Sequence, residues 1–287
     1  MGKNKTLIIV LGPTAVGKTD FSIDLALKYS SPIINCDSRQ IFREMRIGTA
    51  RPSDEQLSRV KHWFIACRSV KDNYTAGRFE LDALELMEEL FKAHDTLVMA
   101  GGSGLYIDAL CNGLDDFPDA DPMLRASLMD RLEKEGLESL RFELSRLDPE
   151  TASHIDPANR QRIVRALEVC LATGKPYSSF RTSPAKERPF KIQKIGLTRP
   201  REELYERINM RVDAMMAEGL EEEARSLLPL RGLPALNTVG YKELFGHFDG
   251  EYDLAEAVRL IKRNTRHYAK KQMTYWQRDP SIEWREL

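Results

Sequence analysis

The residues with the clearest chemistry form a phosphate-binding motif near the start of the chain. Residues 12–19 read Gly-Pro-Thr-Ala-Val-Gly-Lys-Thr, which matches the pattern G-x-x-x-x-G-K-[ST]. A short apolar run precedes the motif and a helical pattern follows it, as this kind of loop requires. The two glycines let the backbone curl so that its N–H groups point inward, and the following helix adds its positive end. The motif therefore predicts a loop that binds a chain of phosphates.

Two side chains of this loop have specific expected tasks. Lys18 can reach the terminal phosphoryl group, and the Thr19 hydroxyl is placed to join the shell of a Mg²⁺ ion that bridges phosphate oxygens. The residues expected to contact the phosphates are Gly12, Thr14, Ala15, Val16, Gly17, Lys18 and Thr19. ATP, GTP and a plain organic diphosphate all present the oxygens that this loop binds, so the motif leaves the ligand open.

Polar residues also follow two other predicted strands. The run at 35–40 reads Asn-Cys-Asp-Ser-Arg-Gln, and the run at 101–106 reads Gly-Gly-Ser-Gly-Leu-Tyr. Ligands of open α/β sheets bind beyond the carboxyl ends of the strands, so Asp37 and Ser103 are candidate site residues. The simpler interpretation is that Asp37 caps a turn and that the glycines only permit a tight bend.

The strand before the second of these runs lacks a feature of hydrolytic P-loop enzymes. Such enzymes carry an apolar strand that ends in an Asp, which holds the Mg²⁺ shell. Here residues 96–100 are followed by Gly101, without a carboxylate. This argues against a motor or switch-type NTPase and leaves small-molecule kinases and transferases that consume a diphosphate.

The elements that must position these residues indicate an α/β fold. Near-continuous apolar runs typical of buried parallel strands occur at Leu7–Leu11, Pro32–Cys36, Thr96–Ala100 and Ile192–Leu197. Helical patterns lie between them. One runs from Tyr74 to His94, and we expect its buried stripe to consist of Leu81, Leu84, Met87 and Phe91. The predicted fold is a P-loop core with a parallel sheet flanked by helices, plus an inserted all-helical region.

The inserted region is indicated by two junctions rich in proline and polar residues. The first follows Cys111 and contains Asp115, Asp116, Pro118, Asp119, Asp121 and Pro122; the second spans Pro184 to Pro189. We therefore expect a first core segment at 1–114, an inserted helical region at 115–188, and a second core segment at 189–287 that ends in a basic helix.

Composition limits the remaining possibilities. The chain has 287 residues, 42% of them hydrophobic, and a formal net charge of −1, so any nucleic-acid surface must come from uneven placement of charge. The four scattered cysteines, Cys36, Cys67, Cys111 and Cys170, suggest neither a zinc site nor a disulfide framework. No apolar stretch is long enough to cross a bilayer. We expect a cytoplasmic protein that does not bind membranes, and a monomer.

Three motifs together resemble the bacterial tRNA dimethylallyltransferase family: the segments at 12–19, 35–42 and 101–106. Further segments at 47–52, 74–79, 159–176 and 240–244 also resemble the blocks of that family, in the family's order. The resemblance implies transfer of a dimethylallyl group from dimethylallyl diphosphate to N6 of adenosine 37 in the anticodon loop of tRNA. Diphosphate would be released, and Mg²⁺ would be required.

The resemblance also implies roles for individual residues. The loop at 12–19 would hold the diphosphate of the prenyl donor in place of a nucleotide, and Asp37 would accept a proton from the adenine amine. Ser103, where the family usually has Thr, would contact the bridging oxygen of the leaving diphosphate. Of Arg207 and Arg211, which lie one helical turn apart, Arg211 is the favoured diphosphate ligand. The alternative for this arginine is a solvated helix face or an ion pair.

The tRNA surface that the resemblance implies includes residues from both predicted regions. Its members are Asp37, Ser38, Arg39, Gln40, Ser103, Arg125, Gln161, Arg162, Ile163, Val164 and Arg165. We expect the helix that carries the last five to begin at Asp156-Pro157 and to end at Gly174. Ion pairs of the arginines with Glu168 are the alternative to RNA contacts.

The last predicted helix, from Asp253 to about Gln272, carries a basic stripe suited to an RNA backbone or simply to solvent. The stripe consists of Arg259, Lys262, Arg263, Arg266 and Lys270. The opposite, apolar face of the helix consists of Leu254, Val258, Ile261 and Tyr268. Tyr275 and Trp276 could stack on a base or pack in the core.

Two other functions compete with the transferase. A small-metabolite kinase would place ATP in the loop and use Asp37 to activate a hydroxyl group. A non-enzymatic RNA-binding module would use the loop only as a switch. The segment at 101–106, the long inserted region and the basic last helix argue against the kinase, because such kinases are compact and need no RNA surface.

Overall fold

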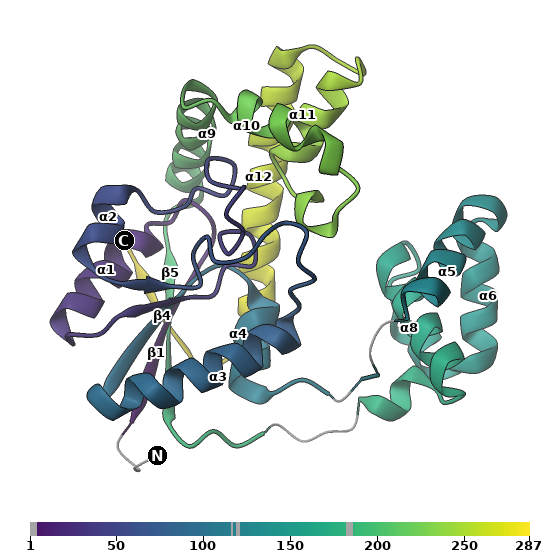
Figure 1. The fold of residues 1–287 in the computed structure, drawn as a ribbon, viewed down its shortest axis with the longest axis horizontal. Helices are drawn as coiled ribbons and strands as arrows, with labels where there is room; N and C mark the ends of the chain where they lie inside the picture. The colour runs from purple at the N-terminus through teal and green to yellow at the C-terminus, as the bar shows by residue number, and fades with distance from the viewer. Residues whose placement is uncertain (1–4, 116, 119–120, 182–185) are drawn as a thin grey trace. The chain divides into compact units, whose positions relative to one another are not determined.

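The computed structural model describes residues 5–115, 117–118, 121–181 and 186–287, which form two compact units (Figure 1). Residues up to 112 and from 187 onward make the core unit, and residues 113–186 make the inserted unit. The expected boundaries, after 114 and after 188, lie within two residues of these. Asp116, Asp119 and Pro184, which the sequence placed at the junctions, lie outside the described residues.

The core unit is built on a parallel sheet with the strand order β3-β2-β4-β1-β5-β6 within the described residues. The strands are β1 (Thr6–Leu11), β2 (Ile33–Asn35), β3 (His62–Trp63), β4 (Thr96–Ala100), β5 (Lys191–Thr198) and β6 (Ile282–Glu286). The four predicted strands and the α/β fold class are confirmed. Two edge strands were missed, because β3 is two residues long and β6 lacks a continuous apolar run.

Helices cover the sheet and extend beyond one end of it (Figure 1). The helices of the core unit are α1 (Lys18–Lys28), α2 (Asp54–Arg59), α3 (Ala76–Ala93), α4 (Gly104–Asn112), α9 (Arg201–Ala217), α10 (Leu220–Leu227), α11 (Tyr241–Phe248) and α12 (Leu254–Trp276). Short 3-10 helices occur at η2 (Leu228–Leu230) and η3 (Pro234–Leu236). One apolar cluster joins the central strands to α1 and α9, and a second joins α9, α10, α11 and α12. Within the described ranges, every helix is too short or too polar to span a bilayer.

Helix α3 confirms the predicted helix but corrects its buried face. Leu81 was expected in the core, yet 62% of it is exposed. The buried stripe contains Phe79, Ala83, Met87 and Phe91. Phe79 sets this rotation, because its ring stacks on Tyr106 of α4 with 4.5 Å between ring centroids.

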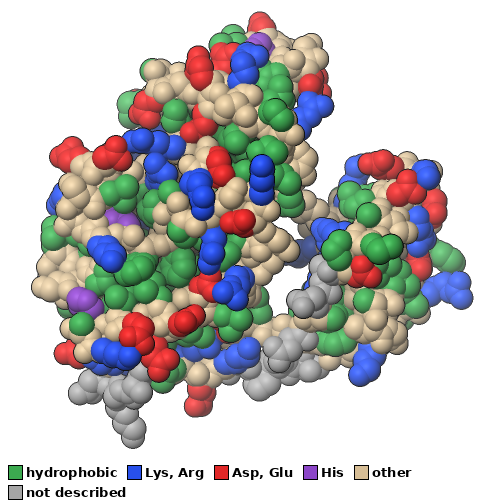
Figure 2. Space-filling model, in the orientation of Figure 1, with side chains coloured by type: hydrophobic (Ala, Val, Ile, Leu, Met, Phe, Trp, Pro, Cys, Tyr) green, Lys and Arg blue, Asp and Glu red, His purple; other side chains and the backbone are tan. Residues whose placement is uncertain are grey.

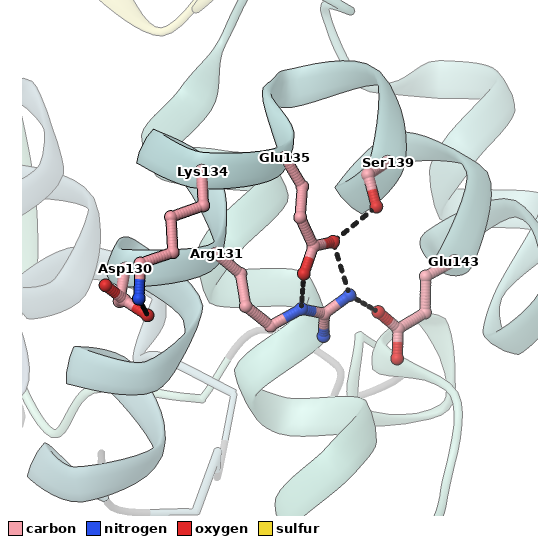
Figure 3. Close-up of polar contacts among 6 residues, drawn as sticks. All are labelled: Asp130, Arg131, Lys134, Glu135, Ser139 and Glu143. Carbon is pink, nitrogen blue, oxygen red and sulfur yellow. Dashed lines mark hydrogen bonds and ion pairs between the residues drawn. The ribbon is translucent and has the colours of Figure 1, made fainter.

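The inserted unit is helical, as expected, and has a hydrophobic core of its own. It consists of α5 (Pro122–Glu135), α6 (Leu137–Leu147), α7 (Pro149–His154), α8 (Arg160–Thr173) and the short η1 (Tyr177–Phe180). Leu128, Leu140, Leu144 and Leu167 form part of that core. Figure 3 shows how Arg131 of α5 reaches Glu143 of α6 at 2.8 Å, while Glu135 accepts hydrogen bonds from both Arg131 and Ser139. The two helices are thereby joined by polar contacts as well as by packing.

The start of α8 differs from the prediction. Asn159, and not Asp156, is its N-cap, because the Asn159 side chain accepts a hydrogen bond from the Arg162 N–H at 3.1 Å. The Asp156 carboxylate instead accepts from the N–H of Ala158 and closes a turn that contains Pro157. The expected end is confirmed, since Gly174 adopts the left-handed conformation there, with φ of 68°.

Candidate active site

Three loops meet at the carboxyl edge of the sheet because the strands that precede them are neighbours. Strand β4 lies between β2 and β1, so the loops after Asn35, Ala100 and Leu11 converge. Gly101 permits this approach, since a Cβ at that position would lie 2.6 Å from the backbone carbon of Cys36. The sequence segments around Asp37 and Ser103 are therefore brought beside the phosphate-binding motif.

Residues 12–19, here named the phosphate loop, have the conformation that their sequence requires. Gly12 has φ of +149°, and a Cβ there would lie 2.7 Å from the Leu197 carbonyl oxygen. The Lys18 ammonium donates to the carbonyl oxygens of Gly12 and Pro13, both at 2.8 Å. Burial and the nearby Arg211 guanidinium lower the pKa of Lys18 to about 8. The loop thus holds a cation that would gain from an anionic partner.

Helix α9 supplies two further cations to the phosphate loop. Arg207 donates through Nε to the Ala15 carbonyl oxygen at 2.9 Å, and Arg211 approaches the Thr14 hydroxyl at 3.5 Å. Burial and the neighbouring Arg207 hold the pKa of Arg211 below its usual value. Neither arginine makes an ion pair within the described part of the chain. The alternative of an ion-paired helix face therefore has no support for Arg211.

Asp37 faces the same space as the phosphate loop. One carboxylate oxygen accepts hydrogen bonds from the backbone N–H groups of Arg39 and Gln40, at 2.8 and 3.3 Å, so the residue does close a turn. It also lines the cavity described below, and it makes no ion pair with any described residue. Asp37 is thus fixed by the turn and still open to a ligand.

Ser103 has a less direct position than the sequence suggested. Its hydroxyl accepts from the backbone N–H of Ser38 at 2.9 Å and donates to the Ser38 hydroxyl at 3.0 Å. The cavity lining includes Gly101 and Gly102, and Ser103 is absent from it among the described residues. The geometry supports a role in holding the loop that carries Asp37. Contact between Ser103 and a leaving diphosphate stays a prediction.

The loops enclose a cavity of about 990 Å³ in the core unit. Its charged lining is mostly basic: Lys18, Arg39, Arg46, Arg51, Arg207, Arg211, Lys242 and Lys271, against Asp20, Asp37, Glu218 and Glu243. In Figure 2, Lys and Arg side chains lie over the middle of the core unit, with a few acidic side chains among them. Although the formal net charge of the chain is −1, the lining of this cavity carries an excess of positive charge.

The cavity also has an apolar wall, formed by the cluster that joins α9 to α12. Side chains of this wall are Ile47, Val212, Met215, Leu220, Val239 and Ile261. Val16, expected among the phosphate contacts, is fully buried, so only its backbone can serve that purpose. The cavity can accordingly hold a ligand with a strongly anionic part and a small apolar part.

The loop at 46–52 forms part of the lining and depends on a residue that the sequence did not single out. Glu223 of α10 accepts hydrogen bonds from the N–H groups of Arg46, Ile47 and Gly48 at 2.8–2.9 Å and from the Tyr241 hydroxyl at 2.6 Å. The Gln40 side chain donates to two carbonyl oxygens of the same loop at 3.1 Å. Gln40, expected to contact tRNA, therefore has a structural task as well.

Helix α12 forms another wall of the cavity and corrects the expected place of Tyr268. Tyr268, assigned to the packed face, is 43% exposed and lines the cavity. Trp276 is buried in the core, and the partly buried Tyr275 donates a hydrogen bond from its hydroxyl to Asp108. Two members of the basic stripe are ion-paired, Arg259 with Glu256 and Lys262 with Asp213. The cavity-facing residues of α12 include Lys271 and Gln272, which the predicted stripe omitted.

In the inserted unit, the predicted tRNA-binding residues divide into exposed and buried ones. Gln161 and Arg162 are exposed. Ile163 and Val164 are buried in the unit's core, so their side chains are not available to RNA, contrary to expectation. Arg125 and Arg165 both pair with the buried carboxylate of Glu168, at 3.1 and 3.2 Å. The ion-pair alternative thus holds for Arg165 and also applies to Arg125.

The donor set of the cavity fits Mg²⁺ bound together with a diphosphate. Thr19, Asp20 and Asp37 offer oxygen atoms to the cavity. Within the described ranges, no three His, Cys, Asp or Glu side chains form a group that could hold a metal ion alone. Mg²⁺ commonly takes one or two protein oxygens and completes its shell with phosphate oxygens and water. Thr19 is the side chain of the motif that would join such a shell.

Known proteins share this sequence and fold. A model of the IPP transferase family matches residues 40–279. The tRNA dimethylallyltransferase 2 of Porphyromonas gingivalis is 54% identical over 282 residues, covering 98% of this chain and 94% of the relative. The solved structure of the full-length tRNA isopentenylpyrophosphate transferase of Bacillus halodurans is 35% identical in sequence to this chain, with a TM-score of 0.70. The match covers 99% of this chain and 90% of that chain.

A eukaryotic dimethylallyltransferase acting on tRNA shares the fold, with a TM-score of 0.81 at 24% identity over 98% of this chain and 74% of that chain. The match of the family model covers more than half of the chain, and the bacterial relative matches almost all of it. This chain therefore belongs to the IPP transferase family, as the motifs at 12–19, 35–42 and 101–106 indicated.

Proposed function

We propose that this protein transfers a dimethylallyl group from dimethylallyl diphosphate to N6 of adenosine 37 in the anticodon loop of tRNA, and releases diphosphate. One observation carries the proposal. The cations Lys18, Arg207 and Arg211 share a single cavity with the Asp37 carboxylate and with an apolar wall. A prenyl diphosphate combines a highly charged part with a small apolar part, and such a cavity matches both.

The chemistry follows from the charges. The bond between C1 of the prenyl group and the diphosphate oxygen breaks, the bond between C1 and the adenine N6 forms, and the N6 proton passes to the Asp37 carboxylate. The main barrier is departure of the diphosphate, whose growing charge Lys18, Arg207 and Arg211 stabilise from fixed positions. A Mg²⁺ ion held with Thr19 would add positive charge at the same oxygens.

The acceptor base must leave its loop to enter the cavity, as enzymes that modify bases generally require. We propose that Ser38 and Arg39, beside Asp37, and the cavity face of α12 receive this base. The exposed Gln161 and Arg162 would contact the tRNA backbone from the inserted unit. A cytoplasmic location, where tRNA is modified, and a monomeric state belong to the same proposal.

The kinase alternative is less well supported. The similar proteins are named tRNA dimethylallyltransferase or tRNA isopentenylpyrophosphate transferase, and none of those described above is a kinase. The phosphate loop alone does not separate the two functions, because both ligands are phosphates.

The direct test is mass spectrometry of an anticodon stem-loop that contains adenosine 37. The stem-loop is incubated with the protein, Mg²⁺ and dimethylallyl diphosphate, and we expect one C5 unit to be added to that adenosine. The control stem-loop carries guanosine at position 37 and should gain no mass. Hydrolysis of ATP without any gain on the adenosine stem-loop would contradict the proposal and favour a kinase.

A further inference from the structure

A buried glutamine on α12 connects two of the three loops of the site. Gln272 is 7% exposed, its Oε1 accepts from the Thr14 N–H at 2.9 Å, and its Nε2 donates to the Gly102 carbonyl oxygen at 2.9 Å. If the amide were flipped, Nε2 would face the Thr14 N–H and Oε1 would face the Gly102 carbonyl oxygen, so neither hydrogen bond could form. Gln272 therefore contacts the phosphate loop with one atom and the turn after β4 with the other.

The contacts of Gln272 lie between the donor side and the acceptor side of the cavity. Thr14 is also approached by Arg211. Gly102 precedes Ser103, whose hydroxyl holds the N–H of Ser38 next to Asp37. A Cβ on Gly102 would lie 2.7 Å from Gln272 Nε2 and 3.6 Å from an Asp37 carboxylate oxygen. One side chain thus joins the phosphate loop to the turn that lies beside the Asp37 carboxylate.

The backbone alone does not hold these loops together. Strands β1 and β4 pair up to Val10 and Ala100, and the hydrogen bond from the Gly101 N–H to the Val10 carbonyl, at 3.2 Å, is their last. Beyond it, Thr14 and Gly102 are joined through Gln272, which comes 258 residues after Thr14 in the sequence. The side chain extends the link between the two loops past the ends of the strands.

We propose that Gln272 is a positioning residue for the transfer reaction, which sets the separation between the phosphate loop and the Asp37 carboxylate. This role rests on the proposed function, because it concerns the alignment of a prenyl diphosphate with the amine that attacks it. A misplacement of about 1 Å in such an alignment can cost about 100-fold in rate. The effect belongs to the chemical step, since each substrate keeps its own binding groups.

The test compares Gln272→Met, which keeps the length of the side chain and removes both hydrogen bonds, with Gln277→Met at the exposed end of the same helix. We expect Gln272→Met to lower kcat by about 10- to 100-fold when both substrates are saturating. The dissociation constants for inorganic pyrophosphate with Mg²⁺ and for the stem-loop should change less than about threefold. Gln277→Met should match the wild type in all three measurements.

A second variant, Gln272→Glu, keeps an acceptor for the Thr14 N–H but loses the donor to Gly102. Its kcat should fall as well, and its affinity for pyrophosphate should also fall, because the new charge lies beside the phosphate loop. A Gln272→Met variant with the wild-type kcat, or one whose loss lies wholly in substrate binding, would overturn the positioning role. If that variant does not fold, Gln272→Glu decides by the same kcat criterion. A wild-type protein without transfer activity would overturn the proposed function itself.

Discussion

Lys18 is placed to respond to both pH and ligand. Burial and the Arg211 guanidinium lower its pKa to about 8, so the ammonium begins to lose its proton just above neutral pH. Only the protonated Lys18 side chain carries the positive charge that attracts a diphosphate. A bound diphosphate would in turn favour the protonated form of Lys18. The affinity for an anion in the phosphate loop is therefore linked to proton uptake at this side chain.

We predict that affinity for inorganic pyrophosphate is nearly constant below pH 8 and falls by up to about tenfold per pH unit above it. The sign follows from the depressed pKa, because the free protein must first take up a proton at alkaline pH. Isothermal titration calorimetry from pH 7 to 9.5 measures this dependence. Lys18→Arg, which stays protonated over this range, corrects for the titration of pyrophosphate itself. Equal pH dependence in both proteins would contradict the prediction.

Asp37 can be tested without disturbing its turn. Asp37→Asn keeps an oxygen that can accept from the Arg39 N–H but removes the base, so we expect kcat to fall by about 10²- to 10⁴-fold. The stem-loop affinity should change little, and fluorescence anisotropy measures it alongside the single-turnover rate. Glu218→Gln is the control, since that acidic residue also lines the cavity but lies outside the oxygen donors assigned to Mg²⁺ and the diphosphate. A loss of rate that is equal in both variants would point to charge in general, and not to a base at Asp37.

At the scale of elements, α10 determines the position of a loop that no short-range signal fixes. Glu223 accepts hydrogen bonds from three successive backbone N–H groups of the loop at 46–52 and from Tyr241. This carboxylate is 177 residues away from Arg46 in the sequence. Removal of one acceptor leaves several partly buried donors without a partner, which is costly.

We predict that Glu223→Ala lowers the free energy of unfolding by about 3 kcal/mol. It should also raise the KM for the prenyl donor, because the loop at 46–52 lines the cavity next to the apolar wall. Urea denaturation and steady-state kinetics provide the two measurements. Glu222→Ala, at an exposed position of the same helix, is the matched control. A donor KM that stays at the wild-type value would show that the loop holds its shape without Glu223.

The elements differ in how far the sequence could predict them. Strands β1, β2 and β4 are buried along almost their whole length, so they appear as continuous apolar runs. Strand β5 is buried only from Ile195 to Leu197, and β6 exposes alternate charged residues. Leu81 was misplaced because an apolar residue at helical spacing need not face the core when aromatic residues of a neighbouring helix decide the rotation.

The residues of the site also differ in whether the local sequence could predict them. The phosphate loop and Asp37 could be predicted because each belongs to a local motif that ends a strand. Gln272 and Glu223 could not, because their partners lie 258 and 177 residues away in the sequence and no local pattern encodes such contacts. Ile163 and Val164 were assigned to a surface from a block of sequence, although helical periodicity within that block already separates them from the exposed Gln161 and Arg162.

At the scale of the whole molecule, the inserted unit has the features of a separable module. It has its own hydrophobic core, and polar contacts around Arg131 join its first two helices (Figure 3). Its first and last residues are close together, since a Cβ on Gly113 would lie 2.5 Å from the Lys186 side chain. A chain whose ends meet can be removed without pulling the core unit apart.

This arrangement allows the two binding tasks to be separated. We predict that replacing residues 113–186 by a Gly-Ser linker of about four residues leaves a folded core unit, because such a linker spans a short gap without strain. Its affinity for pyrophosphate should stay within about threefold of the wild type, since every residue that lines the cavity belongs to the core unit. The stem-loop affinity should fall at least about tenfold, because phosphate contacts dominate RNA binding.

The same surface can be examined in the full-length chain. Arg162→Ala should weaken stem-loop binding and reduce the slope of log affinity against log salt concentration by about one, as expected for the loss of one phosphate contact. Lys134→Ala is the control, because that ammonium is already paired with Asp130 at 2.9 Å. If the linker variant bound the stem-loop as tightly as the whole chain, the tRNA surface would have to lie on the core unit, and α12 with Lys271 beside the cavity would be the place to look.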